Sequence, residues 1–523
     1  MITKAKAALL IAAVLKGGAL LALSAPGEGW GTPGEGTRPT RATALPPGRP
    51  AGGWATTQWL QAPPEIAPIQ SPFAMPQLQR PVFPDRTFNL TDYGAKGDGT
   101  VKNTEAFRKA IAACHGAGGG RVVVPAGNWF TGAIHLKSNV NLHLQEGAEI
   151  HFSDDPNDYL PVVFTRWAGI ELMNYSPLIY ANGCANIAVT GAGKFFGHGK
   201  KWWGWADKGN LETAVWIYEQ QVLKNVPPEK RIHGTPESAL RPQFFNAVHC
   251  TNVLIEGFTV ADGGPFWTFD LTYCERIIVR GLTINTKGGP NNDGVNFNSS
   301  RNGLLEYCEI NSEDDCVAVK AGLNEDGWRV GRPNENIVIR HVRGLTSSTG
   351  GVVFGSEMSG GVRNIYVYDC EFFGNQRALW IKSNASRGGT VENIWFENVR
   401  LSNVRNALMI QADYGAYMAS KNGKAFPTFR NISYKNITVE GAKFPTDISN
   451  IHKPIEGVTM ENVTITGAKT DMRFNQVKGL TLNNVTCNGS SEQTILLTNC
   501  TGVVRSGPVT GTVPPGAVRP PEQ

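Results

Sequence analysis

The sequence carries little charge and lacks the cysteine spacings of a metal site. Charged residues make up 18% of its 523 residues, and the formal net charge is +5, too small and too dispersed to indicate a nucleic-acid partner. The nine cysteines are odd in number and widely separated, and neither CxxC nor HExxH occurs. We therefore expect buried free thiols, no metal and no cofactor. After residue 25, no run of about 20 apolar residues occurs that could cross a membrane.

The first 25 residues are organised like a secretory signal peptide. Lys4 and Lys6 precede the apolar run 7–15, and small residues around Ser24 provide a cleavage site. The alternative is an N-terminal membrane anchor, but Lys16 and two glycines interrupt the apolar stretch. The sequence therefore predicts a secreted protein, periplasmic or extracellular, that leaves the membrane after cleavage.

The remaining chain divides by composition. Residues 26–85 form a linker rich in proline and glycine with an N-terminal extension, residues 86–510 form a single domain, and residues 511–523 form a flexible tail. We expect ordered structure to begin near Arg86 and a short helix to span about 104–113, where apolar residues recur at helical spacing. No signal for a dimer is evident, so we expect a monomer.

An internal repeat dominates the domain. Nine segments of alternating apolar and polar residues recur 22 to 38 residues apart, starting at Asn252, Arg276, Asn302, Asn336, Asn364, Asn393, Asn431, Gly457 and Gly479. Short strands at this period without a helix in each unit indicate a solenoid, here an all-β parallel β-helix. The leading asparagines should stack as a side-chain ladder. The alternative is a β-propeller, whose blades need about 40–50 residues.

The repeat aligns successive coils. Four strands begin at Asp293, Asp315, Gly350 and Arg377, and their third and fifth residues are large and apolar. Because side chains alternate along a strand, these apolar pairs should point into the core, and equivalent positions should stack from coil to coil. The pairs are Val295/Phe297, Val317/Val319, Val352/Phe354 and Leu379/Ile381, and the residues between them, expected to point outward, are Asn296, Ala318, Val353 and Trp380.

This alignment brings carboxylates and cations onto one patch. Asp293, Asp314 and Asp315 lie at the starts of two stacked strands, and Lys320 and Lys382 at the ends of two strands. Crowded carboxylates raise the pKa of at least one member, which gives a proton donor beside ionised bases, as glycoside hydrolysis requires. A solvated Asp/Asn turn cluster is the alternative interpretation from geometry alone.

The chain from about residue 86 to 490 resembles glycoside hydrolase family 28, the polygalacturonases and their relatives, and most of all the bacterial exo-acting members. The segments that carry the resemblance are FNLTDYGAKGDGT (88–100), the stretches 131–167 and 174–193, PNNDG (290–294), EDDCVAVKAG (313–322), GGVVFGSEMSGGVRNI (350–365) and RALWIKSNASRGG (377–389). The resemblance implies a right-handed parallel β-helix, in a single domain with a short N-terminal helix. It also implies hydrolysis of pectic polysaccharides with inversion and without a metal.

The resemblance also implies roles for individual residues. Asp314 matches the general acid, and Asp293 and Asp315 match the residues that activate water. Asn291, Lys320 and Lys382 match substrate-side positions of the same motifs, Lys382 as the lysine that binds a substrate carboxylate. Further candidates for substrate contact are Glu357, for a sugar hydroxyl, and Arg166 and Trp167, on a loop that would close one end of the groove.

Two positions depart from the family pattern. Gly350 stands where the family has a histidine, and the literal GHG at 197–199 lies several coils too early to replace it. Trp380 stands where the family has an arginine, and an indole cannot make a bidentate contact with a carboxylate. We expect Trp380 to stack on a sugar ring and Arg377 or Arg387 to supply the missing charge.

The sequence therefore predicts a secreted hydrolase of α-linked galacturonic acid bonds in pectin that acts from a chain end. The loss of the arginine keeps rhamnogalacturonan or a substituted pectin open as the substrate. Two other classes remain as rivals. One is a calcium-dependent pectate lyase, and the other is a β-helix that binds glycans without catalysis.

Overall fold

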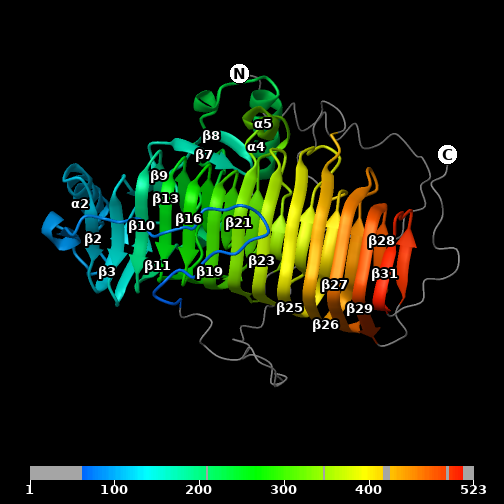
Figure 1. Cartoon of the computed structure of the whole chain (residues 1–523). Helices are drawn as coiled ribbons and strands as arrows, with labels where there is room; N and C mark the ends of the chain where they lie inside the picture. The colour runs from blue at the N-terminus through cyan, green and yellow to red at the C-terminus, as the bar shows by residue number, and fades with distance from the viewer. Residues whose placement is uncertain (1–61, 208–209, 346–347, 416–424, 490–493, 510–523) are drawn as a thin grey trace, which may run out of the picture. The chain divides into compact units, whose positions relative to one another are not determined.

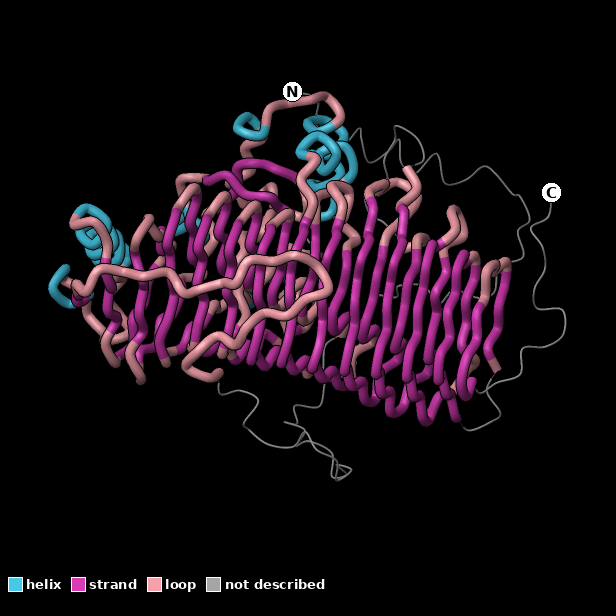
Figure 2. Tube along the Cα trace, viewed as in Figure 1, coloured by secondary structure: helices cyan, strands magenta, loops and turns pink. Residues whose placement is uncertain are grey.

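The computed structural model describes residues 62–207, 210–345, 348–415, 425–489 and 494–509. In these ranges the chain forms a right-handed parallel β-helix, as predicted, in which 29 strands join one parallel sheet (Figures 1 and 2). The expected signal peptide, residues 26–61 of the expected linker and the expected tail lie outside the described residues. None of the described helices is long and apolar enough to cross a membrane.

The sheet winds into three faces, which we number in the order that one coil visits them. Face one contains the four aligned strands analysed above and the strands stacked with them. Its members are β4 (Ile134–His135), β9 (Ile179–Asn182), β12 (Phe245–Val248), β15 (Phe269–Thr272), β18 (Val295–Asn298), β20 (Val317–Lys320), β22 (Gly350–Phe354), β24 (Arg377–Lys382), β28 (Met472–Asn475) and β30 (Ile495–Thr498). Face two begins with β1 (Thr87–Asn89), β2 (Gly120–Val124), β5 (Val140–Leu144), β10 (Ala185–Gly191), β13 (Thr251–Glu256) and β16 (Glu275–Arg280).

Face three begins with β3 (Gly127–Thr131), β6 (Ala148–Phe152), β11 (Lys194–Phe196), β14 (Thr259–Asp262) and β17 (Thr283–Thr286). Later strands run from one face onto the next. They are β19 (Arg301–Ser312), β21 (Asn334–Gly344), β23 (Val362–Phe373), β25 (Thr390–Gln411), β26 (Thr428–Ser449), β27 (Ile455–Ala468), β29 (Val477–Gly489) and β31 (Val504–Val509).

Alternation along face one fills the core as the sequence predicted. Val295 pairs in register with Val317, Val317 with Val352, and Val352 with Leu379. All four side chains are buried in the central cluster of apolar residues. The residues between the core pairs do point away from that cluster, but they too are buried, because other segments cover this face.

Asparagine ladders mark the turn that leads into face two. Asn252 donates to Asn186, Asn336 to Asn302, and Asn364 to Asn336, each through side-chain amides 2.8–3.1 Å apart. These asparagines adopt positive φ angles of 53–58°, a conformation that asparagine tolerates better than most residues. The predicted stacking of the leading asparagines is therefore confirmed.

The first coil is capped by helix α2 (Thr104–Gly116), which buries Phe107 and Ile111 against the core. The predicted helix over 104–113 is confirmed and continues three residues further. The chain between β1 and α2 makes one short turn of helix, η2 (Leu90–Tyr93). The cap keeps water from the open end of the core, which a solenoid needs.

Residues 62–85, which we call the strap, lie along the outside of face two (Figures 1 and 2). Ile69 and Leu78 of the strap are buried against Leu254, Ile278 and other outward-facing residues of this face. The prediction that order begins near Arg86 is therefore wrong. A segment rich in proline resembles a linker in composition, yet proline suits an extended strap that uses its carbonyl groups as acceptors.

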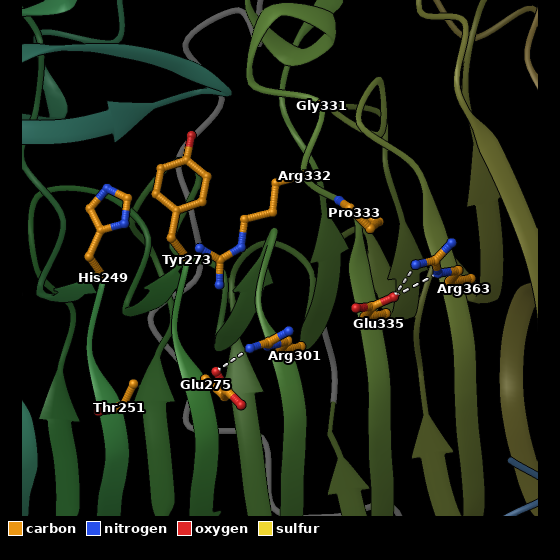
Figure 3. Close-up of a pocket in the computed structure, with 10 residues that line it drawn as sticks. All are labelled: His249, Thr251, Tyr273, Glu275, Arg301, Gly331, Arg332, Pro333, Glu335 and Arg363. Atoms are coloured by element: carbon orange, nitrogen blue, oxygen red, sulfur yellow. Dashed lines mark hydrogen bonds and ion pairs between the residues drawn. The ribbon is translucent and has the colours of Figure 1, made fainter. Parts of the chain in front are cut away.

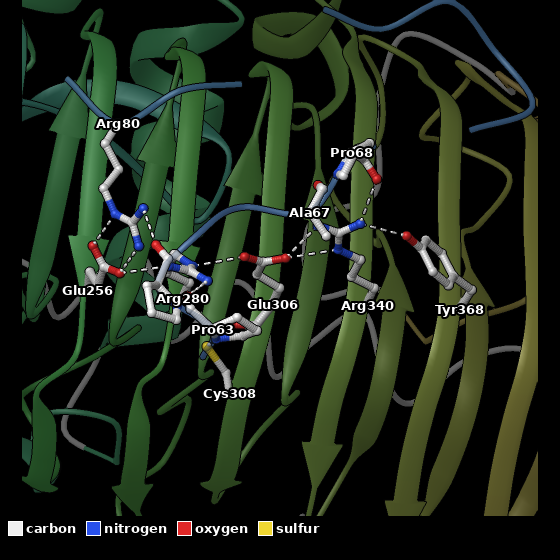
Figure 4. Close-up of polar contacts among 11 residues, drawn as sticks. Pro63, Ala67, Pro68, Arg80, Glu256, Arg280, Glu306, Cys308, Arg340 and Tyr368 are labelled. Atoms are coloured by element: carbon white, nitrogen blue, oxygen red, sulfur yellow. Dashed lines mark hydrogen bonds and ion pairs between the residues drawn. The ribbon is translucent and has the colours of Figure 1, made fainter. Parts of the chain in front are cut away.

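A line of buried charges holds the strap (Figure 4). Glu306, at 0% exposure, lies 2.8 Å from Arg280 and 2.7 Å from Arg340. The same arginines donate to strap carbonyls, Arg280 to Pro63 at 2.8 Å and Arg340 to Ala67 at 2.8 Å. The strap carbonyls thus complete the hydrogen bonding of two buried guanidinium groups.

Two insertions cover face one on its outer side. The first is the antiparallel hairpin of β7 (Val163–Trp167) and β8 (Ile170–Asn174), which follows the turn η3 (Pro156–Tyr159). The second contains α3 (Lys200–Trp203), α4 (Asn210–Ile217), the π-helical turn η4 (Tyr218–Val222) and η5 (Pro228–Lys230). Helix α5 (Asn324–Val330) follows β20 and lies beside them (Figure 1).

Candidate active site

The three aspartates lie where the chain turns onto face one. Asp293 precedes β18 and Asp315 precedes β20, and these strands pair in register, so the two aspartates occupy equivalent positions on adjacent coils. The backbone confirms this, because the amide of Gly294 donates to the carbonyl of Asp315 at 2.9 Å. Asp293 and Asp315 are 2% and 1% exposed, whereas Asp314 is half-buried. Asp314 is therefore the most accessible member of the cluster.

A single hydroxyl bridges the adjacent aspartates. Thr349 Oγ1 lies 2.7 Å from Asp314 Oδ1 and 2.6 Å from Asp315 Oδ1. A hydroxyl has one proton and cannot donate to two ionised carboxylates. Both contacts are satisfied when one of the two carboxyl groups carries a proton and donates to the threonine oxygen.

Two lysines make the surroundings of the aspartates unequal. Lys382 Nζ, from the end of β24, lies 3.0 Å from Asp315 Oδ2. Lys320 Nζ, from the end of β20, lies 3.5 Å from Asp293 Oδ2 and 3.2 Å from Glu357 Oε2. The predicted meeting of acids and lysines on one patch is therefore present, but Lys320 divides its charge between two partners.

The pKa values of the aspartates separate accordingly. Burial opposes the ionisation of Asp315, but Lys382 and Lys320 outweigh it and lower the pKa of this carboxyl group. Burial and the adjacent Asp315 raise the pKa of Asp314. Burial also raises the pKa of Asp293, an effect that Lys320 offsets only in part. The protons belong to a coupled group, in which Asp315 is the member that ionises first.

Glu357 holds Lys320 in place. Its carboxylate is 5% exposed, and although burial opposes ionisation, Lys320 and Arg387 lower its pKa to about 2. It is therefore an ionised partner of Lys320. The predicted contact of Glu357 with a sugar hydroxyl stays a prediction, and the structure adds this second role.

Asn291 links the acid cluster to a buried arginine. Asn291 Nδ2 donates to Asp314 Oδ2 at 3.3 Å, and its Oδ1 accepts from Arg241 Nη2 at 2.7 Å. Arg241 is 0% exposed and also donates to the carbonyl groups of Pro265 and Pro290. Sequence reasoning missed Arg241, which belongs neither to the aligned strands nor to a motif of known spacing. It placed Thr349 in the same aligned position as Asp314, directly before a strand, but gave it no role.

Trp380 is not a free surface for a sugar ring. It is 2% exposed and packs with Val353, Met409 and Tyr414. Its ring lies 4.3 Å from Lys382 Nζ and 4.4 Å from the guanidinium carbon of Arg377. The expectation that Trp380 stacks on substrate therefore fails, because the neighbouring coil and two cations cover the indole. The indole instead supports the two cations next to Asp315.

Arg377 is the better placed of the two expected replacement cations. It begins β24, one coil beyond Gly350, and its side chain makes no hydrogen bond or ion pair with any described residue. Arg387 is 0% exposed and donates to Asn324 Oδ1 at 2.8 Å, away from the aspartates. A guanidinium whose N–H groups have no acceptor among the described residues is suited to a ligand carboxylate.

Arg166 and Trp167 fix the β7–β8 hairpin rather than facing solvent. Arg166 is 0% exposed and donates to Asn298 at 3.2 Å and Ser299 at 2.7 Å, at the end of β18. Trp167 stacks on Phe266 and donates to the carbonyl of Arg241 at 3.0 Å. The expected direct contact of these two residues with substrate is not supported, because the hairpin buries both. The hairpin itself lies over the carboxyl ends of β18 and β20, where the amide of Leu323 also donates to the carbonyl of Gly169 at 3.0 Å.

A polar floor lies under this hairpin. Asp270, in β15, accepts from Gln243 at 3.2 Å and Asn298 at 3.3 Å, and burial raises its pKa to about 6. Asn296 is its neighbour on β18 and is 0% exposed, yet neither amide atom has a hydrogen-bond partner among the described residues. Buried amides without partners are rare. The alignment had given Asn296 an outward position but no role, and it missed Asp270, which extending the alignment back by one coil to β15 would have placed beside Asn296.

Comparison with known proteins accounts for this arrangement. The family model "Glycosyl hydrolases family 28" matches residues 230–489, and the model "Rhamnogalacturonase A/epimerase, pectate lyase-like" matches residues 87–143. The crystal structure of a hyperthermoactive exopolygalacturonase from Thermotoga maritima is 34% identical, covers 83% of this chain and 96% of its own, and superimposes with a TM-score of 0.71. The chain belongs to glycosyl hydrolase family 28.

The protein is therefore a glycoside hydrolase. It is also 29% identical over 389 residues to a probable polygalacturonase of Vitis vinifera, a match that covers 72% of this chain and 74% of the relative. It is 28% identical over 386 residues to the exo-poly-alpha-D-galacturonosidase of Dickeya chrysanthemi, a match that covers 68% of this chain and 62% of the relative. Both matches are long enough to take in several coils of the β-helix.

One departure of this family 28 chain from the pattern has a steric basis. At Gly350, where the family has histidine, an added Cβ would lie 2.0 Å from Val353 Cγ2 and 2.9 Å from Asp315 Oδ1. A side chain there requires that neighbours move. The histidine of the literal GHG, His198, instead contacts His151 on face three at 3.0 Å and has no place in the acid cluster.

Proposed function

We propose that the protein hydrolyses α-linked galacturonic acid bonds in pectin. The observation that carries the proposal is the cluster of Asp293, Asp314 and Asp315 beside Lys382. It combines an accessible carboxyl group of raised pKa with a buried one of lowered pKa. The similarity to exo-acting polygalacturonases supports the choice of substrate.

In the proposed mechanism Asp314 is the general acid. Its proton passes to the glycosidic oxygen as the bond from that oxygen to the anomeric carbon breaks. A water molecule attacks the anomeric carbon and gives a proton to Asp315, assisted by Asp293. Transfer of that proton back to Asp314 restores the starting state. Attack from the opposite face inverts the anomeric configuration.

Recognition of a uronic acid follows from the cations around the acids. Lys382 and Arg377 lie against the indole of Trp380 and extend the positive charge of the site beyond Asp315. Arg377 would take the role of the arginine that the family pattern has at Trp380. A substrate with a carboxylate on each sugar fits this charge, and rhamnogalacturonan or a substituted pectin remains the alternative.

Action from a chain end is the finer part of the proposal. The β7–β8 hairpin lies across face one at the coil of Asn298, where Arg166 fixes it. A wall at this position would stop a polysaccharide from running through the groove and would favour release of single sugars.

We further propose that the chain is exported through its N-terminal 25 residues and acts as a monomer.

Product analysis tests the proposal. Purified full-length protein is incubated with polygalacturonan and, in parallel, with rhamnogalacturonan, with and without a chelator. We expect galacturonic acid as the first product from polygalacturonan and its β-anomer in NMR spectra of fresh product. Loss of activity with chelator, together with an unsaturated product that absorbs ultraviolet light, would instead identify a lyase. Binding without turnover would leave only a glycan-binding role.

A further inference from the structure

A pocket opens on a different part of the molecule from the acid cluster (Figure 3). It has a volume of about 540 Å³ and lies at the turn where face one passes into face two. None of its lining residues belongs to the acid cluster. They are His249, Thr251, Tyr273, Glu275, Arg301, Gly331, Arg332, Pro333, Glu335 and Arg363.

Four charged side chains of the lining form two closed pairs. Glu275 and Arg301 start adjacent strands of face two and lie 2.6 Å apart. Glu335 and Arg363 start the strands two coils further on and lie 2.5 Å apart. Figure 3 shows the two pairs side by side below Arg332. Within each pair the glutamate neutralises the arginine, and one cation of the lining is left without a counter-charge.

That cation is Arg332. Its side chain makes no hydrogen bond or ion pair with any residue that the structure describes, and its guanidinium carbon lies 5.5 Å from the ring centre of Tyr273. The backbone fixes its place, because Gly331 ends α5 in the left-handed conformation and Pro333 follows. Arg332 is half-buried, so its charge is only partly hydrated.

The wall beside Arg332 is aromatic. The rings of His249 and Tyr273 stack 4.7 Å apart at 24°, and Phe164 stacks behind His249 at 6.1 Å. His249 is exposed to solvent, while burial and then Arg332 lower its pKa and keep it neutral near pH 7. A neutral ring beside a free guanidinium offers one apolar surface and one bidentate donor.

We propose that this pocket binds a uronic acid residue, with its carboxylate on Arg332 and its ring beside His249. One unmatched cation suits a ligand with a single negative charge, and the paired glutamates disfavour a dianion such as a phosphate ester. The choice of a uronic acid over other carboxylates rests on the proposed function. The sugar comes either from the free product or from a polymer chain held away from the acid cluster.

This site can be tested by measuring sugar binding to a variant that does not cleave its substrate. Asp314→Asn protein is titrated calorimetrically with D-galacturonic acid, with trigalacturonic acid and with neutral D-galactose. The same titrations are made with Arg332→Gln added and, as a matched control, with Arg430→Gln. Arg430 also starts a strand of face two and is paired with Glu392 at 2.5 Å, but it does not line the pocket.

We expect Arg332→Gln to remove one binding site or to weaken it at least about tenfold, as expected for a lost charge-assisted hydrogen bond. Arg430→Gln should bind like its parent, and galactose should not bind there. Binding of the monosaccharide indicates capture of free product, whereas binding of the trisaccharide alone indicates a held chain. Unchanged binding in Arg332→Gln, or equal binding of galactose, would overturn the proposal.

Turnover separates this proposal from the proposed function. Arg332→Gln in the otherwise unchanged protein should cleave trigalacturonic acid at the normal rate, since Arg332 is not part of the acid cluster. If the unchanged protein cleaves no galacturonan, the proposed function fails while the binding result still stands. If the cleavage rate is normal but binding does not depend on Arg332, the proposed binding site is disproved and the proposed function stands.

Discussion

Asp314 and Asp315 are neighbours in the chain, yet their environments differ. Asp315 is 1% exposed and lies 3.0 Å from an ammonium group, whereas Asp314 is half-buried and accepts from the amide of Asn291. Thr349 connects the two through one hydroxyl. A proton therefore favours Asp314, which is the member that a substrate can reach.

Replacing Asp314 with asparagine removes the proposed proton donor. We expect kcat to fall by several orders of magnitude, because general acid catalysis alone contributes about 10²–10⁴-fold and the proton-sharing contact with Thr349 is also lost. The measurement is kcat on polygalacturonan, with circular dichroism to confirm folding. Glu313→Gln, on the same bend, is the control and should stay near the unchanged rate. Near-normal turnover in folded Asp314→Asn would disprove the assignment.

Lys382→Gln tests whether Lys382 lowers the pKa of Asp315, and the test is the pH profile of kcat. Burial opposes the ionisation of Asp315, and Lys382 is the foremost cause that lowers its pKa. Without the ammonium group the pKa of Asp315 rises, so the base becomes ionised only at higher pH. We expect the acidic limb of the kcat profile to move to higher pH, together with a larger KM for the anionic substrate. The control is Lys435→Gln, whose side chain is 43% exposed and far along the chain from the acid cluster, and its acidic limb should not move. An acidic limb that also stays in place in Lys382→Gln would exclude this role.

Gly350→Ala tests whether the acid cluster needs a glycine. The added Cβ would lie 2.0 Å from Val353 Cγ2 and 2.9 Å from Asp315 Oδ1. Overpacking of this kind costs about 1–3 kcal/mol, so we expect lower stability in urea and a reduced kcat as Asp315 shifts. Gly116→Ala, where nothing lies within 4 Å of the new atom, is the control. A fully stable and active Gly350→Ala would show that the site tolerates an added side chain at this position.

The sequence predicted the acid cluster because its members lie at fixed positions of a repeat. Once strands align, Asp293 and Asp315 must stack, and the register confirms this. Arg241 could not be found this way, because its contacts depend on how a long loop folds back. Thr349 shares the aligned position of Asp314, but the alignment alone does not show that its hydroxyl bridges the two aspartates. The same limit explains the error at Trp380, whose covering by Met409 and Tyr414 comes from the next coil and the loop after it.

At the scale of elements, the strap is the part that composition misrepresented. Its prolines resemble those of a linker, but its fold is decided by partners up to several coils away. Phe73, for example, packs near Trp395 with ring centres 5.7 Å apart. A sequence pattern reports local preference, whereas the strap forms only because face two presents an apolar strip and a row of arginines.

Glu306→Gln tests how much the line of buried charges contributes to the stability of the protein. The carboxylate lies between Arg280 and Arg340, which are 0% and 3% exposed. Removing it leaves two buried cations short of a partner, a change that costs about 3–5 kcal/mol. We expect that loss in urea unfolding and faster proteolysis within residues 62–85. Glu392→Gln, whose partner Arg430 is 47% exposed, should cost about 0–1 kcal/mol, and equal losses in both variants would contradict the inference.

At the scale of the whole molecule, stability should vary along the solenoid. Each coil contacts mainly its neighbours, so such molecules open from their ends. Helix α2 caps the first coil and the strap lies across the coils of β13 to β23, but most of β31 is exposed. The described C-terminal coils therefore have fewer covering contacts.

Hydrogen exchange measures this difference. We expect amides of β28, β30 and β31 to exchange through smaller openings than amides of β16, β19 and β21, because the strap adds contacts to the latter group. The measurement is native-state exchange followed by mass spectrometry at increasing urea. Equal opening free energies along the whole chain would show that the solenoid unfolds as one unit.

The position of the strap also determines the order in which the molecule can be completed. The apolar side chains of Ile69 and Phe73 leave the ribosome early, but Val338 and Trp395, which help to cover them, are made hundreds of residues later. During synthesis these groups have no native partner, so the segment stays available to other factors until most coils exist. Docking of the strap is therefore a late step of folding, which is complete only after the chain has been synthesised through at least Trp395.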